Sequence, residues 1–111
     1  MSCEQNQGRE RSPGVDFSVI VPLYNEEESV TPLYVSLIAA LEALGRSFEI
    51  LLVDDGSRDG TFARAAALAR RDARLRVIKF RRNYGQTAAM AAGIDQARGA
   101  ILVTMDGDLQ N

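Results

Sequence analysis

Four short runs of apolar residues alternate along the chain with three longer segments that repeat at helical spacing. The apolar runs predict four strands, at residues 17–21, 49–53, 75–80 and 100–105. The segments between them predict three helices, at residues 27–44, 60–72 and 86–97. Strands that alternate with helices are typical of an α/β fold with a parallel sheet and right-handed crossovers.

The residue pattern within the strands also predicts their order in the sheet. Arg76 and Lys79 interrupt the third strand, which is typical of an edge strand. We therefore expect the order 3-2-1-4, with the topological switch point, where such folds bind ligands, between strands one and four. Pro22 is expected to end the first strand.

Length and composition exclude several classes of protein. A chain of 111 residues holds one domain with a modest core, and we expect a disordered leader at 1–16 before a domain at 17–111. The absence of His excludes His-based zinc sites and His-dependent nucleophile pairs, and a net charge of −2 does not indicate a nucleic-acid partner. The leader lacks the apolar core of a signal peptide, and no apolar run approaches the roughly 20 residues of a membrane span.

Charge is unevenly distributed along the chain. Residues 1–57 contain ten acids and three bases, whereas residues 58–82 contain nine bases and two acids. A solvated helix and edge strand account for such a basic stretch. The alternative is attraction to anionic lipid or to the phosphates of a nucleotide.

Polar clusters directly follow strands one, two and four. The clusters are Pro22, Tyr24 and Glu26, then Asp54 and Asp55, then Asp106, Asp108 and Gln110. Any one of them could be a turn that closes a strand. Because these three strands are neighbours in the expected order, however, all three clusters meet at one rim, and this favours a binding site.

The residue types at this rim suit a nucleotide sugar. The oxygens of Asp106, Asp108 and Gln110 are those that Mg²⁺ or Mn²⁺ prefers when it also binds phosphate. Tyr24 can stack on a base, and Asp55 can accept a hydrogen bond from a base N–H. A dinucleotide fold would need Gly-x-Gly-x-x-Gly after the first strand, and a phospho-receiver would need its acidic pair there.

Four motifs carry a family resemblance. They are V-P-x-Y-N-E (21–26), V-D-D-G-S-x-D-G-T (53–61), R-N-Y-G-Q (82–86) and D-G-D-L-Q-N (106–111). In order and spacing the chain from 17 to 111 resembles inverting GT-A-type glycosyltransferases of family 2. Within that family it is similar to the dolichyl-phosphate and polyprenyl-phosphate sugar synthases, including bacterial undecaprenyl-phosphate sugar transferases.

The resemblance implies a Rossmann-like GT-A fold and a role for each cluster. The residues implied to line the nucleotide pocket are Pro22, Tyr24, Glu26, Val53, Asp54 and Asp55. Among them, Val53 and Asp55 would hold the base or ribose, and Asp54 would support them or brace its loop. Asp106 and Asp108 would be catalytic and would hold Mg²⁺ or Mn²⁺ together with Gln110.

The implied enzyme transfers a sugar from a UDP- or GDP-sugar to a polyprenyl phosphate at the cytoplasmic membrane surface. Family members continue beyond the aspartate motif, so we expect this chain to carry the donor and metal half. With the fourth strand as an edge, we also expect self-association through residues 100–105. Two alternatives stay open at this point: a non-catalytic nucleotide-binding module, and a GT-A transferase that acts on a saccharide or protein.

Overall fold

The computed structural model describes residues 15–105, and every strand and helix expected in that range is present. The strands are β1 (Phe17–Leu23), β2 (Phe48–Asp54), β3 (Leu75–Lys79) and β4 (Ile101–Thr104). The helices are α2 (Glu27–Ala43), α3 (Thr61–Arg71) and α4 (Gln86–Gln96). All the pairings are parallel and the strand order is β3-β2-β1-β4, which confirms the predicted 3-2-1-4 sheet.

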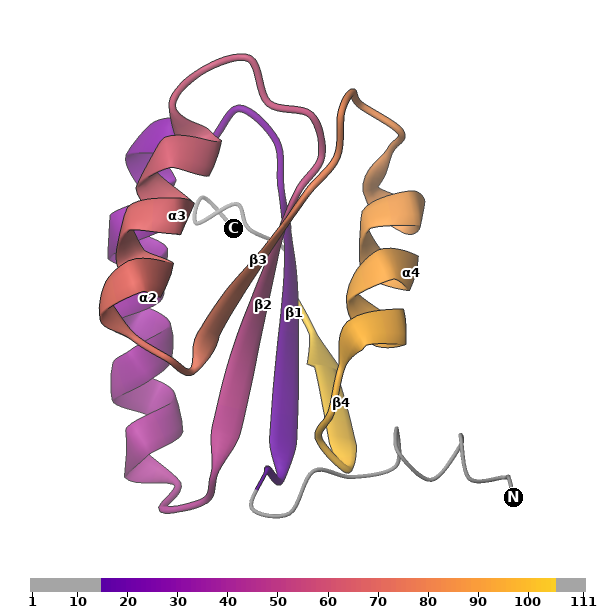
Figure 1. The fold of residues 1–111 in the computed structure, drawn as a ribbon. Coiled ribbons are helices and arrows are strands. Elements are labelled where there is room, and N and C mark those ends of the chain that lie inside the picture. Colours follow the sequence, from indigo (N-terminus) through magenta and orange to yellow (C-terminus); the bar gives the residue numbers. More distant parts are fainter. Residues whose placement is uncertain (1–14, 106–111) are drawn as a thin grey trace.

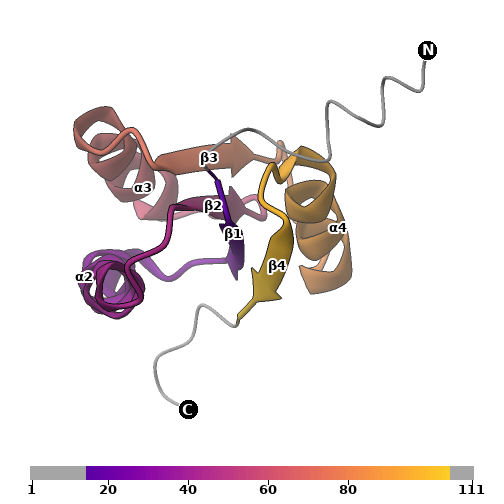
Figure 2. The ribbon, with the colours of Figure 1, turned by 90° about the horizontal axis from the view of Figure 1, so that it is seen from below.

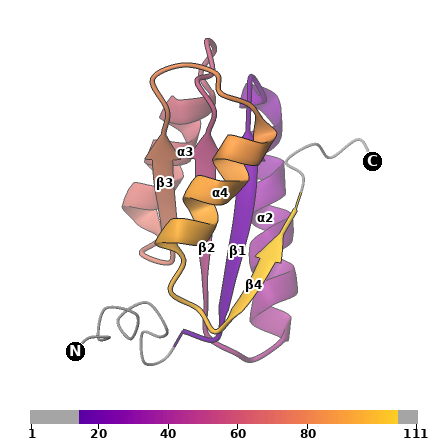
Figure 3. The same cartoon turned by 90° about the vertical axis from the view of Figure 1, so that its right-hand side faces the viewer.

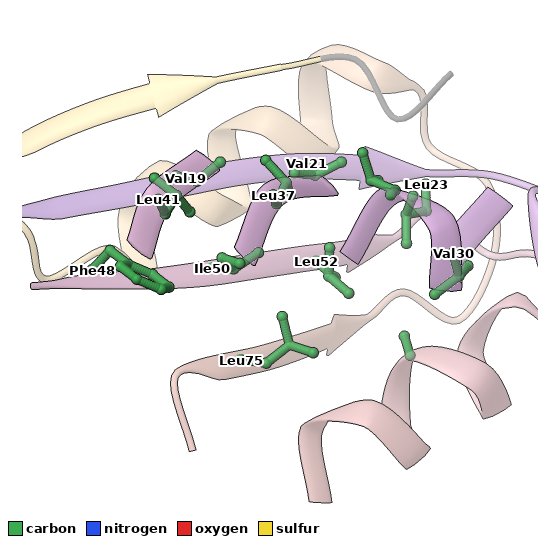
Figure 4. Close-up of a cluster of buried hydrophobic side chains, with 12 residues drawn as sticks. Val19, Val21, Leu23, Val30, Leu37, Leu41, Phe48, Ile50, Leu52 and Leu75 are labelled. Carbon is green, nitrogen blue, oxygen red and sulfur yellow. The ribbon is translucent and has the colours of Figure 1, made fainter. Parts of the chain in front are cut away.

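The sheet lies between two helical layers. Helices α2 and α3 cover one face and α4 covers the other (Figures 1 and 2). Side chains of β1 and β2 alternate between these faces, so the same two strands supply both cores. The α2 side buries a cluster that Figure 4 shows, which includes Val19, Val21, Leu23, Val30, Leu37, Leu41, Ile50 and Leu52. The α4 side buries Ile20, Leu51, Val53, Ala89 and Ala97.

The prediction that Pro22 ends the first strand is wrong. β1 continues through Pro22 to Leu23, which pairs with Asp54 of β2. The Ile20 carbonyl accepts a hydrogen bond from Met105, so the backbone of Ile20, and of Pro22 two residues later, faces β4. β4 ends at Thr104, opposite Ile20, and Pro22 therefore interrupts no ladder bond among residues 15–105.

β4 is short and, within the described range, has a neighbour only on its β1 side (Figure 3). Its apolar side chains are exposed, at 46% for Ile101, 42% for Leu102 and 40% for Val103. No helix within residues 15–105 has the length and apolar content to span a membrane.

A buried carboxylate ties the strands together at the end of the sheet opposite the predicted site. The Ser18 hydroxyl and the Arg98 N–H donate to Glu49 Oε2, at 2.6 and 2.7 Å, and Arg76 Nη1 donates to Glu49 Oε1 at 2.9 Å. Burial alone would raise the pKa of Glu49, but these donors outweigh it and lower the pKa below its usual value. The network joins β1, β2 and β3 to the turn that leads into β4.

This network predicts a loss of stability in acid. A carboxyl group whose pKa is lowered by folding stabilises the fold above its unfolded pKa of about 4.3, and this stabilisation is lost as pH falls towards the folded pKa. We expect Glu49→Gln to lower the free energy of unfolding at pH 7 by about 1–3 kcal/mol and to flatten its dependence on pH below about 4.3. Urea unfolding at several pH values measures both effects.

Glu28→Gln, at an exposed position in the first turn of α2, is the matched control and should change the stability at pH 7 and the acid slope only slightly, because it loses only the attraction of an exposed acid to the helix dipole, about 0.3–1 kcal/mol. Equal acid slopes for the parent chain and Glu49→Gln would contradict the assignment.

Candidate functional site

The loops after β1, β2 and β3 lie together at the carboxyl end of the sheet, at the top of Figure 1. β4 runs in the same direction, and the Met105 N–H donates to the Ile20 carbonyl at 3.0 Å. The predicted metal ligands Asp106, Asp108 and Gln110 follow Met105 in the sequence and lie outside the described residues. The structure therefore describes the nucleotide side of the predicted site.

A pocket of about 140 Å³ opens at this rim. Its lining residues are Pro22, Leu23, Tyr24, Glu26, Asp55 and Gln86. They come from the end of β1, the end of β2 and the start of α4. Four predicted site residues, Pro22, Tyr24, Glu26 and Asp55, are therefore brought together, and Leu23 and Gln86 join them.

Tyr24 and Glu26, the two pocket residues from the loop after β1, differ in how far their side chains interact with the rest of the protein. Tyr24 is 42% exposed, so its ring is accessible for stacking. The Glu26 carboxylate accepts the N–H of Tyr24 through Oε1 at 3.1 Å, which braces the loop.

The neighbouring acids at the end of β2 point to opposite faces of the sheet. Asp54 continues the row of Ile50 and Leu52, which faces α2 and α3, and Asp55 continues the row of Leu51 and Val53, which faces α4. Both are almost fully buried, at 0% and 3% exposure. The two carboxylates therefore serve two different loops and do not share one ligand.

Asp55 holds the loop before α4. Its Oδ1 accepts the Tyr84 N–H at 2.7 Å and, more weakly, the Gly85 N–H at 3.3 Å. Its Oδ2 accepts the Asn83 side-chain amide at 2.9 Å and the Gly85 N–H at 3.0 Å. Both oxygens are thus occupied within the chain, and a contact between Asp55 and a base or ribose stays a prediction.

Asp54 and Val53 are more deeply buried. Asp54 Oδ1 accepts the Ser57 N–H at 3.2 Å, whereas Asp54 Oδ2 is buried and has no hydrogen-bond partner among residues 15–105. The Val53 side chain packs in the core beneath α4, so any contact of Val53 with a ligand would come from its backbone. Asp54 accordingly braces its own loop, and the predicted ligand role of Val53 stays untested.

Hydrogen bonds link the loop after β1 to the loop after β2. Asn25, at φ 51°, donates its N–H to Ser57 Oγ at 2.8 Å and accepts the Arg58 N–H through Oδ1 at 2.7 Å. The Glu26 N–H donates to Thr61 Oγ1 at 2.8 Å. The two loops therefore form one unit around the pocket.

Asp59 completes this unit by capping two helix starts. It accepts the N–H of Thr61 at 2.9 Å and that of Glu27 at 3.3 Å. Burial would raise the pKa of Asp59, but the hydrogen bonds from Thr61 and Glu27 outweigh it and lower the pKa. An ionised carboxylate at these positive helix ends is favourable.

Sequence reasoning missed Gln86 as a pocket residue and Asn25 as the link between loops. The R-N-Y-G-Q motif was the available signal for Gln86, because it precedes a predicted helix at the same rim. Nothing local distinguishes Asn25, since its partners lie more than 30 residues away in sequence.

The described residues contain no group of three acids, Cys or His that could hold a metal ion. The predicted carboxylate and amide ligands of the D-G-D-L-Q-N motif follow β4, and β4 pairs with the strand that carries Pro22. Their oxygen donors fit Mg²⁺ or Mn²⁺. The metal site itself remains a prediction from the sequence.

Comparison with known proteins places this site in context. A family model described as "Glycosyl transferase family 2" matches residues 18–111. A dodecaprenyl-phosphate galacturonate synthase of Rhizobium johnstonii is 49% identical over 98 residues, which cover 87% of this chain and 29% of that protein. An undecaprenyl-phosphate 4-deoxy-4-formamido-L-arabinose transferase of Pseudomonas paraeruginosa is 50% identical over 95 residues, 85% of this chain and 28% of that protein. The chain thus spans less than a third of the length of these relatives.

Two solved structures share the fold. The crystal structure of S. aureus TarS 1-349 has a TM-score of 0.70 and 32% identity, over 85% of this chain and 28% of that one. TarS 1-349 is also known in complex with UDP and with UDP-GlcNAc. The mannosyltransferase PcManGT from Pyrobaculum calidifontis, in complex with GDP-Man and Mn²⁺, has a TM-score of 0.66 and 27% identity, over 83% of this chain and 27% of that one.

The packing of the rim loops predicts a specific sensitivity at Gly56. Its φ is +73°, and a Cβ there would lie 2.2 Å from the Arg82 carbonyl carbon and 2.4 Å from the Asn83 N. Gly56→Ala therefore forces the loop after β2 away from the loop after β3. We expect it to lower the free energy of unfolding by about 3 kcal/mol or more, from backbone strain and overpacking together, measured by urea unfolding.

Gly45→Ala is the matched control, because Gly45 has a similar φ of +70° but no atom within 4 Å of the added Cβ. It should lose only the strain of a left-handed backbone, about 1–2 kcal/mol. Equal losses for the two variants would show that the loop contact is unimportant.

Proposed function

The chain belongs to glycosyl transferase family 2, and on that basis we propose that it is the donor-binding part of a polyprenyl-phosphate sugar transferase. The donor is a nucleoside diphosphate sugar, with uracil or guanine as the base. The acceptor is a polyprenyl phosphate, such as an undecaprenyl or dolichyl phosphate. The main support is the pocket at the carboxyl ends of β1 and β2 in a family 2 fold, together with about 50% identity to relatives named for undecaprenyl- and dodecaprenyl-phosphate transfer.

In this proposal, different residues at the rim bind the nucleoside and the diphosphate of the donor. Tyr24 stacks on the base, while Pro22, Glu26 and Asp55 shape the pocket that receives the nucleoside. Asp106, Asp108 and Gln110 hold Mg²⁺ or Mn²⁺ against the diphosphate. When bound, the metal neutralises the negative charge that develops on the departing nucleoside diphosphate.

The chemistry of the acceptor explains why the proposed site can act without His. A lipid phosphate oxygen is already anionic near neutral pH, so it can attack the anomeric carbon without a strong general base. The nucleoside diphosphate leaves from the opposite side, which inverts the configuration. A polyprenyl chain is apolar and stays in the bilayer, so we propose that the reaction occurs at the cytoplasmic membrane surface.

The metal assignment predicts that binding of a nucleoside diphosphate depends on the cation. In titration calorimetry with UDP and GDP, Mn²⁺ should strengthen binding relative to EDTA. Asp108→Asn should weaken binding in Mn²⁺ by about 1–3 kcal/mol, the scale of losing a charged partner. Equal affinity in EDTA and in Mn²⁺ would overturn the metal assignment.

Tyr24→Ala is the comparison variant for this experiment. Because Tyr24 is proposed to contact the nucleoside, its loss should weaken binding of uridine or guanosine as well as of the diphosphates. That loss should be the same with and without Mn²⁺. If only the diphosphates bound more weakly, Tyr24 would belong to the phosphate side of the site.

A second proposal concerns the edge of β4 that has no neighbour among residues 15–105, through which we expect the chain to associate with a second copy. Ile101, Leu102 and Val103 are all exposed by 40% or more, and an apolar strand edge readily pairs with another strand. Light scattering should show dimers or larger species, and Leu102→Lys should shift them towards the monomer. A monodisperse monomer of the parent chain with a sharp thermal transition would contradict this proposal.

A further inference from the structure

Two polar side chains of the pocket, the Tyr24 hydroxyl and the Gln86 amide, make no hydrogen bond within the described part of the protein, and of these the Gln86 amide has the larger hydrogen-bonding capacity. Asp55 already accepts hydrogen bonds at both oxygens, and Glu26 accepts the Tyr24 N–H. Gln86 lines the same pocket and is exposed, and its side chain makes no hydrogen bond with any residue from 15 to 105. Its amide offers one acceptor and two donors to whatever enters.

The position of Gln86 is set by the backbone around it. Gly85 has φ 105° and ψ 160°, a conformation essentially confined to glycine, and its N–H donates to Asp55 Oδ2 at 3.0 Å. Gln86 is the first residue of α4, and Ala89, one turn later, is fully buried against the sheet. The backbone of Gln86 is therefore held from both sides, by Asp55 through the loop and by the core through α4, and its side chain starts from a fixed point at the pocket.

Gln86 and Tyr24 approach the pocket from different elements. Tyr24 comes from the loop after β1 and offers an aromatic face, whereas Gln86 comes from the start of α4 and offers a neutral amide. An aromatic face binds any base with little discrimination. Discrimination between bases comes instead from polar groups that match the donors and acceptors on the base edge.

We propose that the Gln86 amide hydrogen-bonds the edge of the donor's nucleobase, and that Asp55 is the positioning residue that holds it there. This inference rests on the proposed nucleotide-sugar function and adds the group that reads the base. A neutral amide suits the task, because it can donate and accept at adjacent atoms of a base and does not repel the diphosphate. Asp55 then acts on base preference through the loop at 83–85.

The first test measures base preference in Gln86→Ala by titration calorimetry with Mn²⁺. The probes are UDP, GDP, CDP and ADP, together with ribose 5-diphosphate, which has no base. We expect about tenfold weaker binding of the preferred nucleotide, the scale of a lost hydrogen bond, and a smaller spread among the four. Binding of ribose 5-diphosphate should be unchanged.

Thr87→Ala is the matched control, since Thr87 is the next residue of α4, is exposed and does not line the pocket. It should preserve both affinity and preference. If the parent chain prefers one base and Gln86→Ala keeps that preference in full, the inference fails while the proposed function stands. If the parent chain binds none of the nucleotides, the proposed function itself fails.

The second test separates positioning from direct contact by a double-mutant cycle. Asp55→Asn removes a carboxylate oxygen that the loop needs, and we expect it to reduce base preference as Gln86→Ala does. If Asp55 acts through Gln86, the double variant should be no worse than Gln86→Ala alone. Additive losses would mean that Asp55 contacts the base itself and would overturn its positioning role.

Asn83→Ala repeats this test without altering a pocket residue. It removes the two hydrogen bonds that the Asn83 amide donates to the backbone carbonyl and to Oδ2 of Asp55, and it leaves the pocket lining intact. We expect a partial loss of base preference in this variant and none when Gln86 is already Ala. Thermal melts of each variant establish that it is folded under the assay conditions. If Asp55→Asn is unfolded, Asn83→Ala alone tests whether Asp55 acts through Gln86.

Discussion

The geometry of the rim depends on the pleat at the end of β2. Consecutive residues of a strand point to opposite faces, so Asp54 and Asp55 direct their carboxylates to two different helical layers. Asp55 then gathers the backbone before α4, and Asp54 braces the turn before α3. A shift of one residue in the pairing of β2 would exchange the two carboxylates and detach both loops from the sheet.

These buried carboxylates explain why the loops around the pocket keep one arrangement. A charge without donors is costly to bury, and Asp55 avoids that cost only while residues 83–85 remain in place. The burial of Asp55 therefore also holds the loop at 83–85, because moving this loop would leave a buried carboxylate without donors. The Asp54 carboxylate has fewer hydrogen-bond donors to offset its burial, because its Oδ2 has no partner in the described range.

The sequence was sufficient for the fold because its signals are local or depend on simple periodicity. Arg76 and Lys79 marked β3 as the edge, and the apolar runs marked the other strands. Pro22 was misjudged because a local rule cannot tell which side of a strand lacks a neighbour. The pocket was predictable at Tyr24 and Glu26, since residues that follow a parallel strand must reach the rim. Asn25, Asn83 and Gln86 lie in sequence motifs, but their roles depend on contacts across about 30 residues of sequence or on a pocket assembled from several elements, and the motifs alone do not identify these partners.

The distribution of charge within the site follows from the same contacts. Among the described lining residues, the acids Glu26 and Asp55 both hold backbone N–H groups of the protein. These two carboxylates therefore interact with the protein backbone, whereas Tyr24 and Gln86 present neutral groups to the pocket. A nucleoside, which is neutral, suits such a surface better than a phosphate does. The anionic half of a nucleotide sugar then has to be bound elsewhere, and the carboxylates that follow β4 can accept it only with a cation between them. The cation that we propose for this site would therefore complement a nucleoside pocket whose own acids are engaged within the chain.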